Sequence, residues 1–155
     1  MAIHWLNNFA NLGYMINKIY IAGPLFNKHE QMYLEDIAKE LEGKGYDCFL
    51  PHRDQPPEVT ASDLEGTDMS QEIKDLIFKT DLDALDAADL TVALLTGQDI
   101  DSGTSAEIGH TFAKGKPVIG INANERRYRN LFVEGMVTVT VNNIDQLIPE
   151  IEKLN

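Results

Sequence analysis

The chain has 155 residues, of which 43% are hydrophobic and 25% are charged, and its formal net charge is −12. This length and balance are typical of one soluble globular domain and exclude a second core. An acidic surface does not attract phosphates, so nucleic acid is not expected as a partner, and a small neutral substrate is favoured.

Cysteine and histidine usage limits the other possible chemistries. Cys48 is the only cysteine, which excludes an internal disulfide and a cysteine-based metal site. The four histidines do not have metal-ligand spacing, so no metal is expected. Residues 1–14 lack the pattern of a secretory leader, and no stretch is apolar enough to span a bilayer, so the expected location is the cytoplasm.

The first predicted elements follow an N-terminal extension, which we assign to residues 1–17, with one domain over 18–155. Lys18–Ala22 is a short apolar run that ends at Gly23-Pro24, which predicts a strand. Helical spacing of apolar residues predicts a helix over 29–43, and a second strand is expected at 46–50, with Cys48 in the core. The polar segment 51–69 predicts a long loop, and long loops in small domains are usually functional.

The second half of the chain continues the alternation. Helices are expected at 70–86, 104–114 and 144–154, and strands at 89–95, 117–121 and 136–141, with a loop or short helix at 122–134. Strands that alternate with helices predict an α/β domain with a doubly wound, flavodoxin- or Rossmann-like parallel sheet of five strands. Ligands of such sheets bind beyond the carboxyl ends of the strands.

The segment from Asp101 to Glu107 carries the most specific chemical signal. It places two carboxylates around a glycine loop, and two carboxylates can flank a sugar at its anomeric carbon. We expect Glu107 in the first turn of its helix, where the helix dipole favours an ionised nucleophile. The alternative is a capping box formed by Thr104 and Glu107, and the pattern alone leaves both open.

Two other parts of the chain supply further candidates. Tyr20, near the end of the first strand, either orients Glu107 through its phenol or packs in the core. Four acids follow at the end of the 70–86 helix, namely Asp81, Asp83, Asp86 and Asp89. Acids near a helix C-terminus oppose the dipole, which indicates a use for at least one of them.

These segments together resemble the nucleoside 2-deoxyribosyltransferase family. The resemblance runs from about Ile19 to Val137 and is strongest over Asp101–Gly109 with the following Gly115-Lys-Pro-Val. Ile19–Asn27 and Asp81–Asp89 add to it. It implies an enzyme that transfers 2-deoxyribose between nucleobases, with retention, through a covalent glycosyl-glutamate, without metal or organic cofactor. Its partners would be deoxyribonucleosides and free nucleobases.

The resemblance also implies a function for individual residues. Glu107 matches the nucleophile, Tyr20 the residue that orients it, and Asp81 the acid that exchanges a proton with the base. The residues implied to bind substrate are Asp101 at the sugar hydroxyls, Gln55 at the nucleobase, and Gly23, Phe26, Gly103, Asn130 and Phe132. Asn130 would reach the site of a neighbouring subunit, which implies a homo-oligomer of two or more chains. His52-Arg53-Asp54 before Gln55 departs from the family pattern and leaves purine or pyrimidine preference open.

Two alternatives remain at this stage. A related deoxynucleoside 5′-monophosphate N-glycosidase would pass the sugar to water, but we expect a serine-like group in place of Asp101 in such enzymes, because an acid there repels phosphate. A non-catalytic nucleoside- or nucleotide-sensing module would bind ligand without turnover. It would not need the combination of Tyr20, Asp81, Asp101 and Glu107.

Overall fold

The computed structural model describes residues 15–65, 68–97, 99–122 and 130–155. Helices and strands alternate along them as predicted. In chain order they are β1 (Lys18–Ala22), α1 (Lys28–Glu42), β2 (Asp47–Phe49), α2 (Ala61–Glu65), α3 (Gln71–Ala87), β3 (Leu90–Leu95), α4 (Ser102–Ala113), β4 (Val118–Asn122), α5 (Leu131–Glu134), β5 (Val139–Val141), the 3-10 helix η2 (Ile144–Gln146) and α6 (Leu147–Leu154).

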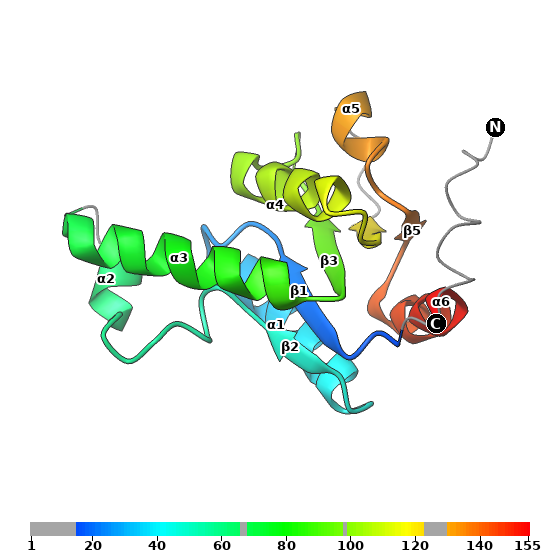
Figure 1. The fold of residues 1–155 in the computed structure, drawn as a ribbon, viewed down its shortest axis with the longest axis horizontal. Coiled ribbons are helices and arrows are strands. Elements are labelled where there is room, and N and C mark those ends of the chain that lie inside the picture. The colour runs from blue at the N-terminus through cyan, green and yellow to red at the C-terminus, as the bar shows by residue number, and fades with distance from the viewer. Residues whose placement is uncertain (1–14, 66–67, 98, 123–129) are drawn as a thin grey trace.

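The five strands form one parallel sheet in the order β2-β1-β3-β4-β5 (Figure 1). This is the flavodoxin-like order of a doubly wound sheet, so the predicted fold class is confirmed. The strand order reverses between β1 and β3, and a ligand site is expected beyond the carboxyl ends of the strands there. Each residue of β3 is buried, as its continuous apolar sequence predicts for a central strand.

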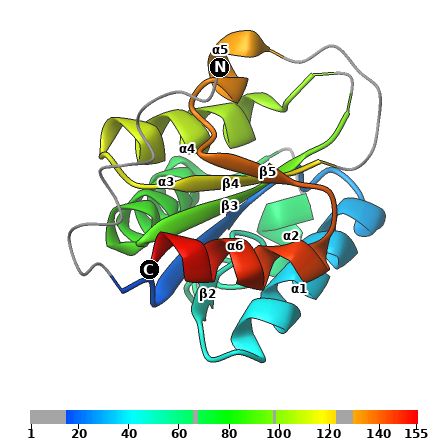
Figure 2. The same cartoon turned by 90° about the vertical axis from the view of Figure 1, so that its right-hand side faces the viewer.

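Helices cover the sheet on both faces. Apolar residues of α1 and α6 pack on one face, and those of α3, α4 and α5 pack on the other. Figure 2 shows α1 and α6 below the sheet and α4 and α5 above it. Cys48 is buried in the first of these cores, as predicted. Ile16 is also in that core, and its backbone N–H donates to Oδ1 of Asn155 at 2.7 Å, so the chain is already tied to the domain two residues before β1.

Strand β5 begins at Val139 rather than at residue 136, and two further differences from the sequence prediction concern the segment 51–69 and helix α4. The segment 51–69 is not a continuous loop, because it contains the five-residue helix α2. Helix α4 begins at Ser102 rather than at residue 104, because the side chain of Asp101 caps it by accepting from the N–H groups of Gly103 and Thr104. This second difference changes the expected environment of Glu107.

Helix α3 extends beyond the sheet. Figure 1 shows its N-terminal half projecting to one side together with α2, while its C-terminal half lies over the strands. The burial agrees, since Leu85, near the C-terminal end, is the one residue of α3 that is buried.

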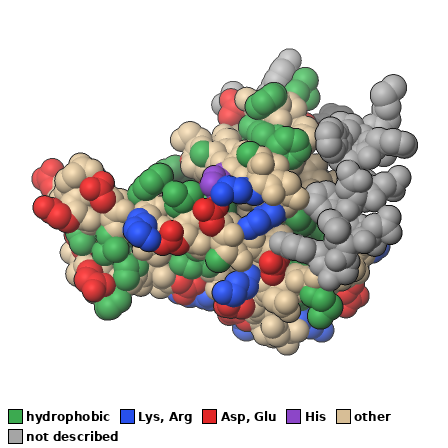
Figure 3. Space-filling view, in the orientation of Figure 1, with side chains coloured by type: hydrophobic (Ala, Val, Ile, Leu, Met, Phe, Trp, Pro, Cys, Tyr) green, Lys and Arg blue, Asp and Glu red, His purple; other side chains and the backbone are tan. Residues whose placement is uncertain are grey.

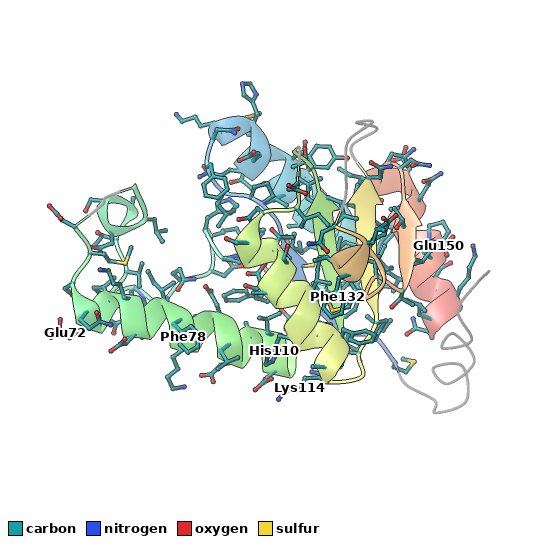
Figure 4. The ribbon with its side chains drawn as sticks, turned by 90° about the horizontal axis from the view of Figure 1, so that it is seen from above. Glu72, Phe78, His110, Lys114, Phe132 and Glu150 are labelled. Carbon is teal, nitrogen blue, oxygen red and sulfur yellow. The ribbon has the colours of Figure 1, made fainter. Side chains whose placement is uncertain are left out.

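The C-terminal end of α3 is held by basic side chains from the end of α4 and from the turn after it. Nζ of Lys116 donates to the carbonyls of Asp86 and Ala88, at 2.7 and 2.6 Å. The Asp86 carboxylate pairs with His110 at 2.8 Å and with Lys114 at 3.0 Å. His110 and Lys114 lie on the side of α4 that faces the end of α3 (Figure 4). Cations at a helix C-terminus are favourable, and here they also join the helix of Asp81 to the helix of Glu107.

Candidate active site

A hydrogen bond between Tyr20 and Glu107 is at the centre of the candidate site. Tyr20 lies on β1, is fully buried, and stacks on Phe49 with ring centroids 5.4 Å apart. Its hydroxyl donates to Oε1 of Glu107 at 2.7 Å. A strand residue and a helix residue that are 87 positions apart in sequence therefore meet at one carboxylate.

The environment of Glu107 differs from the one expected. Because α4 begins at Ser102, Glu107 lies in the second turn, and the capping box with Thr104 does not form. Burial raises the pKa of Glu107 to about 8, the bond from Tyr20 lowers it, and the charges of Asp81 and Asp101 raise it further. The prediction of a carboxylate kept ionised by the helix N-terminus is therefore wrong: in the free protein burial favours the protonated form.

Asp81 is the second acid of the site and comes from α3. Its Oδ1 accepts from Nε2 of Gln55 at 2.8 Å, and the same amide nitrogen donates to the carbonyl of Pro51 at 2.8 Å. Burial raises the pKa of Asp81 to about 6, although the bond from Gln55 lowers it. Oε1 of Gln55 is buried and has no hydrogen-bond partner among the described residues, so it is an acceptor that a ligand could use.

The carboxylates of Asp81 and Glu107 share one electrostatic environment. The charge of Asp81 raises the pKa of both Tyr20 and Glu107, so the groups lie near one another. Two acids with pKa values of about 6 and about 8 hold one proton between them near neutrality. One member of such a pair can give a proton while the other acts as a base or nucleophile.

Asp101 lies at the start of α4, and both of its oxygens are used there. Oδ1 accepts from the N–H of Gly103 at 3.2 Å, and Oδ2 accepts from the N–H of Thr104 at 2.9 Å and from its hydroxyl at 2.6 Å. The negative charge of Asp101 raises the pKa of Glu107. The predicted substrate residues Asp101 and Gly103 thus border the same site.

Gly23 and Phe26 lie after the carboxyl end of β1. A Cβ atom at Gly23 would lie 2.6 Å from Cδ2 of Leu34 and 3.2 Å from Cβ of Leu94, so a larger residue here would force the Leu34 side chain on α1 to shift. Phe26 is 79% exposed, and its N–H donates to Oε2 of Glu30 at 3.0 Å. The Phe26 ring is therefore open to solvent rather than packed in the core.

Asn130 and Phe132 lie at the start of α5. Oδ1 of Asn130 caps that helix by accepting from the N–H groups of Phe132 and Val133, at 3.0 and 3.3 Å. Phe132 is 80% exposed and lies on the outer surface (Figure 4). This cap on a helix of the same chain was not expected from the sequence.

Sequence reasoning missed three residues around Glu107. Phe49 packs against the ring of Tyr20. The hydroxyl of Thr111 donates to the carbonyl of Glu107 at 2.9 Å, and it also contacts the hydroxyl of Thr91 at 2.7 Å. The spacing of four between Glu107 and Thr111 is a signal for the first of these bonds, but the contact with Thr91 depends on how β3 is placed in the sheet.

The described residues contain no group of three or more His, Cys, Asp or Glu side chains that could hold a metal ion. They also contain no helix long and apolar enough to cross a membrane.

Comparison with solved structures finds proteins of the same fold. A conserved protein from Enterococcus faecalis is 26% identical, with a TM-score of 0.73 over 89% of this chain and 98% of that one. A 2-deoxyribosyltransferase from Bacillus psychrosaccharolyticus is 26% identical, with a TM-score of 0.70 over 84% and 89%. A CMP N-glycosidase from Clostridium botulinum, 21% identical, shares the fold with a TM-score of 0.57 over 88% and 99%.

The comparison with curated proteins found no match. A comparison with family models gives a match over residues 19–148, and the model is described as nucleoside 2-deoxyribosyltransferase. The matched range begins one residue before Tyr20 and includes Asp81, Asp101 and Glu107. By this match, which covers most of the chain, the protein belongs to the nucleoside 2-deoxyribosyltransferase family.

Proposed function

We propose that this protein transfers 2-deoxyribose from one nucleobase to another by a double displacement, with Glu107 as the nucleophile. The observation that carries the proposal is the hydrogen bond from the buried Tyr20 to the half-buried Glu107, with a second half-buried acid, Asp81, close enough to raise the pKa of both groups. Two carboxyl groups with separate functions are what retaining chemistry at an anomeric carbon requires.

In the first step, a carboxylate oxygen of Glu107 forms a bond to C1′ of the sugar as the bond between C1′ and the base nitrogen breaks. The departing base takes the bonding electron pair, and Asp81 gives it a proton. The products are a 2-deoxyribosyl ester of Glu107, a free base and ionised Asp81. The phenol of Tyr20 keeps one oxygen of Glu107 fixed, so that the other can face C1′.

In the second step, a nitrogen of the incoming base forms a bond to C1′ from the side that the first base left. Asp81 takes the proton from that nitrogen, and the ester bond breaks to regenerate the carboxylate of Glu107. Two inversions at C1′ give net retention. Water in place of the second base would give hydrolysis instead.

The protonation states that this mechanism needs are ionised Glu107 and protonated Asp81. In the free protein the acid with the higher pKa is Glu107, at about 8, and that of Asp81 is about 6. The reactive form is therefore a minor one, and the single proton of the pair must lie on Asp81 when the bond to the base breaks. Both forms carry the same charge, so the interchange needs no proton from solvent.

Asp101 and Gln55 support the choice of substrate. The charge of Asp101 at the mouth of the site disfavours a 5′-phosphate, so deoxyribonucleosides are the proposed donors. The buried Oε1 of Gln55 lacks a partner among the described residues and is beside Asp81, so it is available to an N–H of the base. Asp101, Gly103, Gly23, Phe26 and Phe132 complete the proposed substrate contacts.

We also propose that the active form is a homo-oligomer in which Asn130 contributes to a neighbouring site. Leu131 and Phe132 are 82% and 80% exposed, although such large apolar side chains are normally covered. Figure 3 shows hydrophobic side chains gathered on the surface over α5 and the adjoining part of α4. Asn130 precedes these residues directly, so a chain that covers them would lie next to its amide.

Base exchange is the assay for this function. Purified protein is mixed with deoxyinosine or thymidine and free adenine, and the products are separated by chromatography. Deoxyadenosine is the expected product, and Glu107→Gln should form none of it. Free deoxyribose without a new nucleoside would identify a hydrolase, and binding without turnover would identify a sensing module.

Complementation is the assay for the shared site. Asn130→Ala and Glu107→Gln chains are prepared separately, dissociated and reassembled together. If Asn130 serves a neighbour, mixed oligomers contain sites with an intact Glu107 and an intact Asn130, so exchange returns. Activity that stays at the level of the separate variants, or a fully active monomer in sedimentation, would contradict the shared site.

A further inference from the structure

Three threonines of the described residues, Thr91, Thr104 and Thr111, have side chains that are buried, each no more than 2% exposed. Each has a hydrogen bond. Thr104 donates to Asp101 at the start of α4, and Thr111 donates to the carbonyl of Glu107 further along the same helix. Burying a hydroxyl is unfavourable unless it is bonded, and valine has nearly the same shape. Packing alone therefore does not require threonine at Thr91 or Thr111.

The hydrogen bonds of the Thr91–Thr111 pair run in one direction. The hydroxyl of Thr111 has one proton and lies 2.9 Å from the carbonyl oxygen of Glu107, which can only accept. The proton of Thr111 is therefore directed to Glu107, and the hydroxyl of Thr91, 2.7 Å away, donates to Thr111. The result is a chain of two bonds that runs from β3 to the main chain of Glu107.

Thr91 is the neighbour of Tyr20 in the sheet. The two residues are paired in register between β3 and β1, so their side chains point to the same face, toward α4. Tyr20 reaches the carboxylate of Glu107, and Thr91 reaches its main chain through Thr111. Tyr20 and Thr91, which are neighbours in the sheet, thus fix the side chain and the main chain of Glu107.

We infer that the Thr91–Thr111 pair positions the main chain of Glu107 over the sheet so that its carboxylate meets the phenol of Tyr20. A threonine hydroxyl bonded to the carbonyl four residues earlier adds to the backbone bond of that carbonyl and tilts the local turn. Thr91 and Thr111 are positioning residues in this proposal, because they act through Glu107 and need not touch substrate. The inference rests on the proposed function only for its effect on rate.

Valine substitutions separate positioning from stability. Thr111→Val removes the bond to Glu107 and leaves the Thr91 hydroxyl buried without its acceptor, so both rate and stability should fall. In the double variant Thr91→Val with Thr111→Val, neither hydroxyl remains, and replacing both partners by apolar groups of the same shape is nearly neutral for stability. The double variant should therefore regain a melting temperature near that of the unchanged protein while its rate stays low.

The expected loss of kcat for base exchange is roughly 10- to 100-fold in the double variant, with KM changed less than about twofold, because a displaced nucleophile mainly affects the chemical step. Thr111→Ser keeps the hydroxyl, so this variant should retain most of the rate of the unchanged protein. Ile108→Val is the matched control: Ile108 is fully buried on the same helix, and shortening it lowers stability without touching the hydroxyl bonds. That control should keep its kcat.

A second measurement does not depend on turnover. The pKa of the Glu107 carboxyl is followed by carbon NMR of protein labelled at glutamate, with Glu107→Gln to assign the signal. The pKa of Glu107 in the double variant should differ from that in the unchanged protein, whereas in Thr111→Ser it should be the same. A double variant with unchanged kcat and an unchanged Glu107 pKa would overturn the inference. If the unchanged protein shows no exchange at all, the proposed function fails, and the NMR measurement still decides whether the pair positions Glu107.

Discussion

Replacing Tyr20 by phenylalanine removes one hydroxyl and leaves in place the ring that stacks on Phe49. The hydroxyl donates to Oε1 of Glu107 at 2.7 Å, and a hydrogen bond to a charged group contributes about 1.5–3 kcal/mol. If the whole bond is present in the transition state, kcat/KM should fall by roughly 10- to 150-fold, since about 1.4 kcal/mol corresponds to a factor of ten.

The same substitution should change the dependence of the rate on pH. The bond from Tyr20 lowers the pKa of Glu107, so without it that pKa rises above about 8. Less Glu107 is ionised near neutrality, which lowers the maximum, and the fall in rate at high pH moves to a higher value. Initial rates of base exchange between pH 5 and 10 measure both effects.

Tyr33→Phe is the matched control, because Tyr33 lies on α1 and packs against the core on the opposite face of the sheet. It should keep the rate and pH profile of the unchanged protein. If Tyr20→Phe also keeps them, the phenol does not orient a reactive Glu107, and the reasoning from the hydrogen bond is refuted.

Three further predictions concern pH and stability. For the unchanged protein, kcat/KM should be bell-shaped with limbs near pH 6 and 8, because the reactive form of the Asp81–Glu107 pair holds one proton; a flat profile over this range would contradict it. Glu107→Gln should be more stable than the unchanged protein by a few kcal/mol at pH 8 and above, and equally stable below about pH 4.5. The folded protein binds the Glu107 proton more tightly than the unfolded chain does, so stability is lost as pH rises from 4.5 through about 8. Denaturant unfolding at several pH values measures the stability difference between Glu107→Gln and the unchanged protein, and a difference that does not change with pH would contradict the prediction. Lys116→Met should lower the free energy of unfolding by about 1–3 kcal/mol, because the carbonyls of Asp86 and Ala88 lose a charged donor, and no loss in urea unfolding would mean that the lysine does not stabilise this end of α3.

Much of the fold follows from periodicity and from glycine and proline punctuation. The apolar run before Gly23-Pro24 gives β1 with its observed bounds, Lys18–Ala22, and the continuous apolar run at 89–95 contains β3. Helix α2 could not be predicted, because five residues carry too little periodicity and so short a helix depends on its tertiary contacts.

The site was less predictable than the fold for two physical reasons. Asp101 and Thr104 are both good helix caps, and the choice between them decides whether Glu107 lies in the first or the second turn. The burial of Glu107 depends on the whole layer of side chains above β1, so the upward shift of its pKa could not be predicted from its position on the helix. The pairing of Thr91 with Tyr20 depends on strand register, which the sequence alone does not reveal.

A covalent bond between the sugar and Glu107 is the step on which the proposed mechanism depends. Protein mixed with a deoxyribonucleoside and no acceptor base is quenched in acid, digested and analysed by peptide mass spectrometry. We predict a 2-deoxyribosyl adduct on the peptide that contains Glu107, lost when adenine is added before the quench and absent in Glu107→Gln. Base exchange without any such adduct, or an adduct that persists in Glu107→Gln, would contradict a mechanism in which Glu107 is the nucleophile.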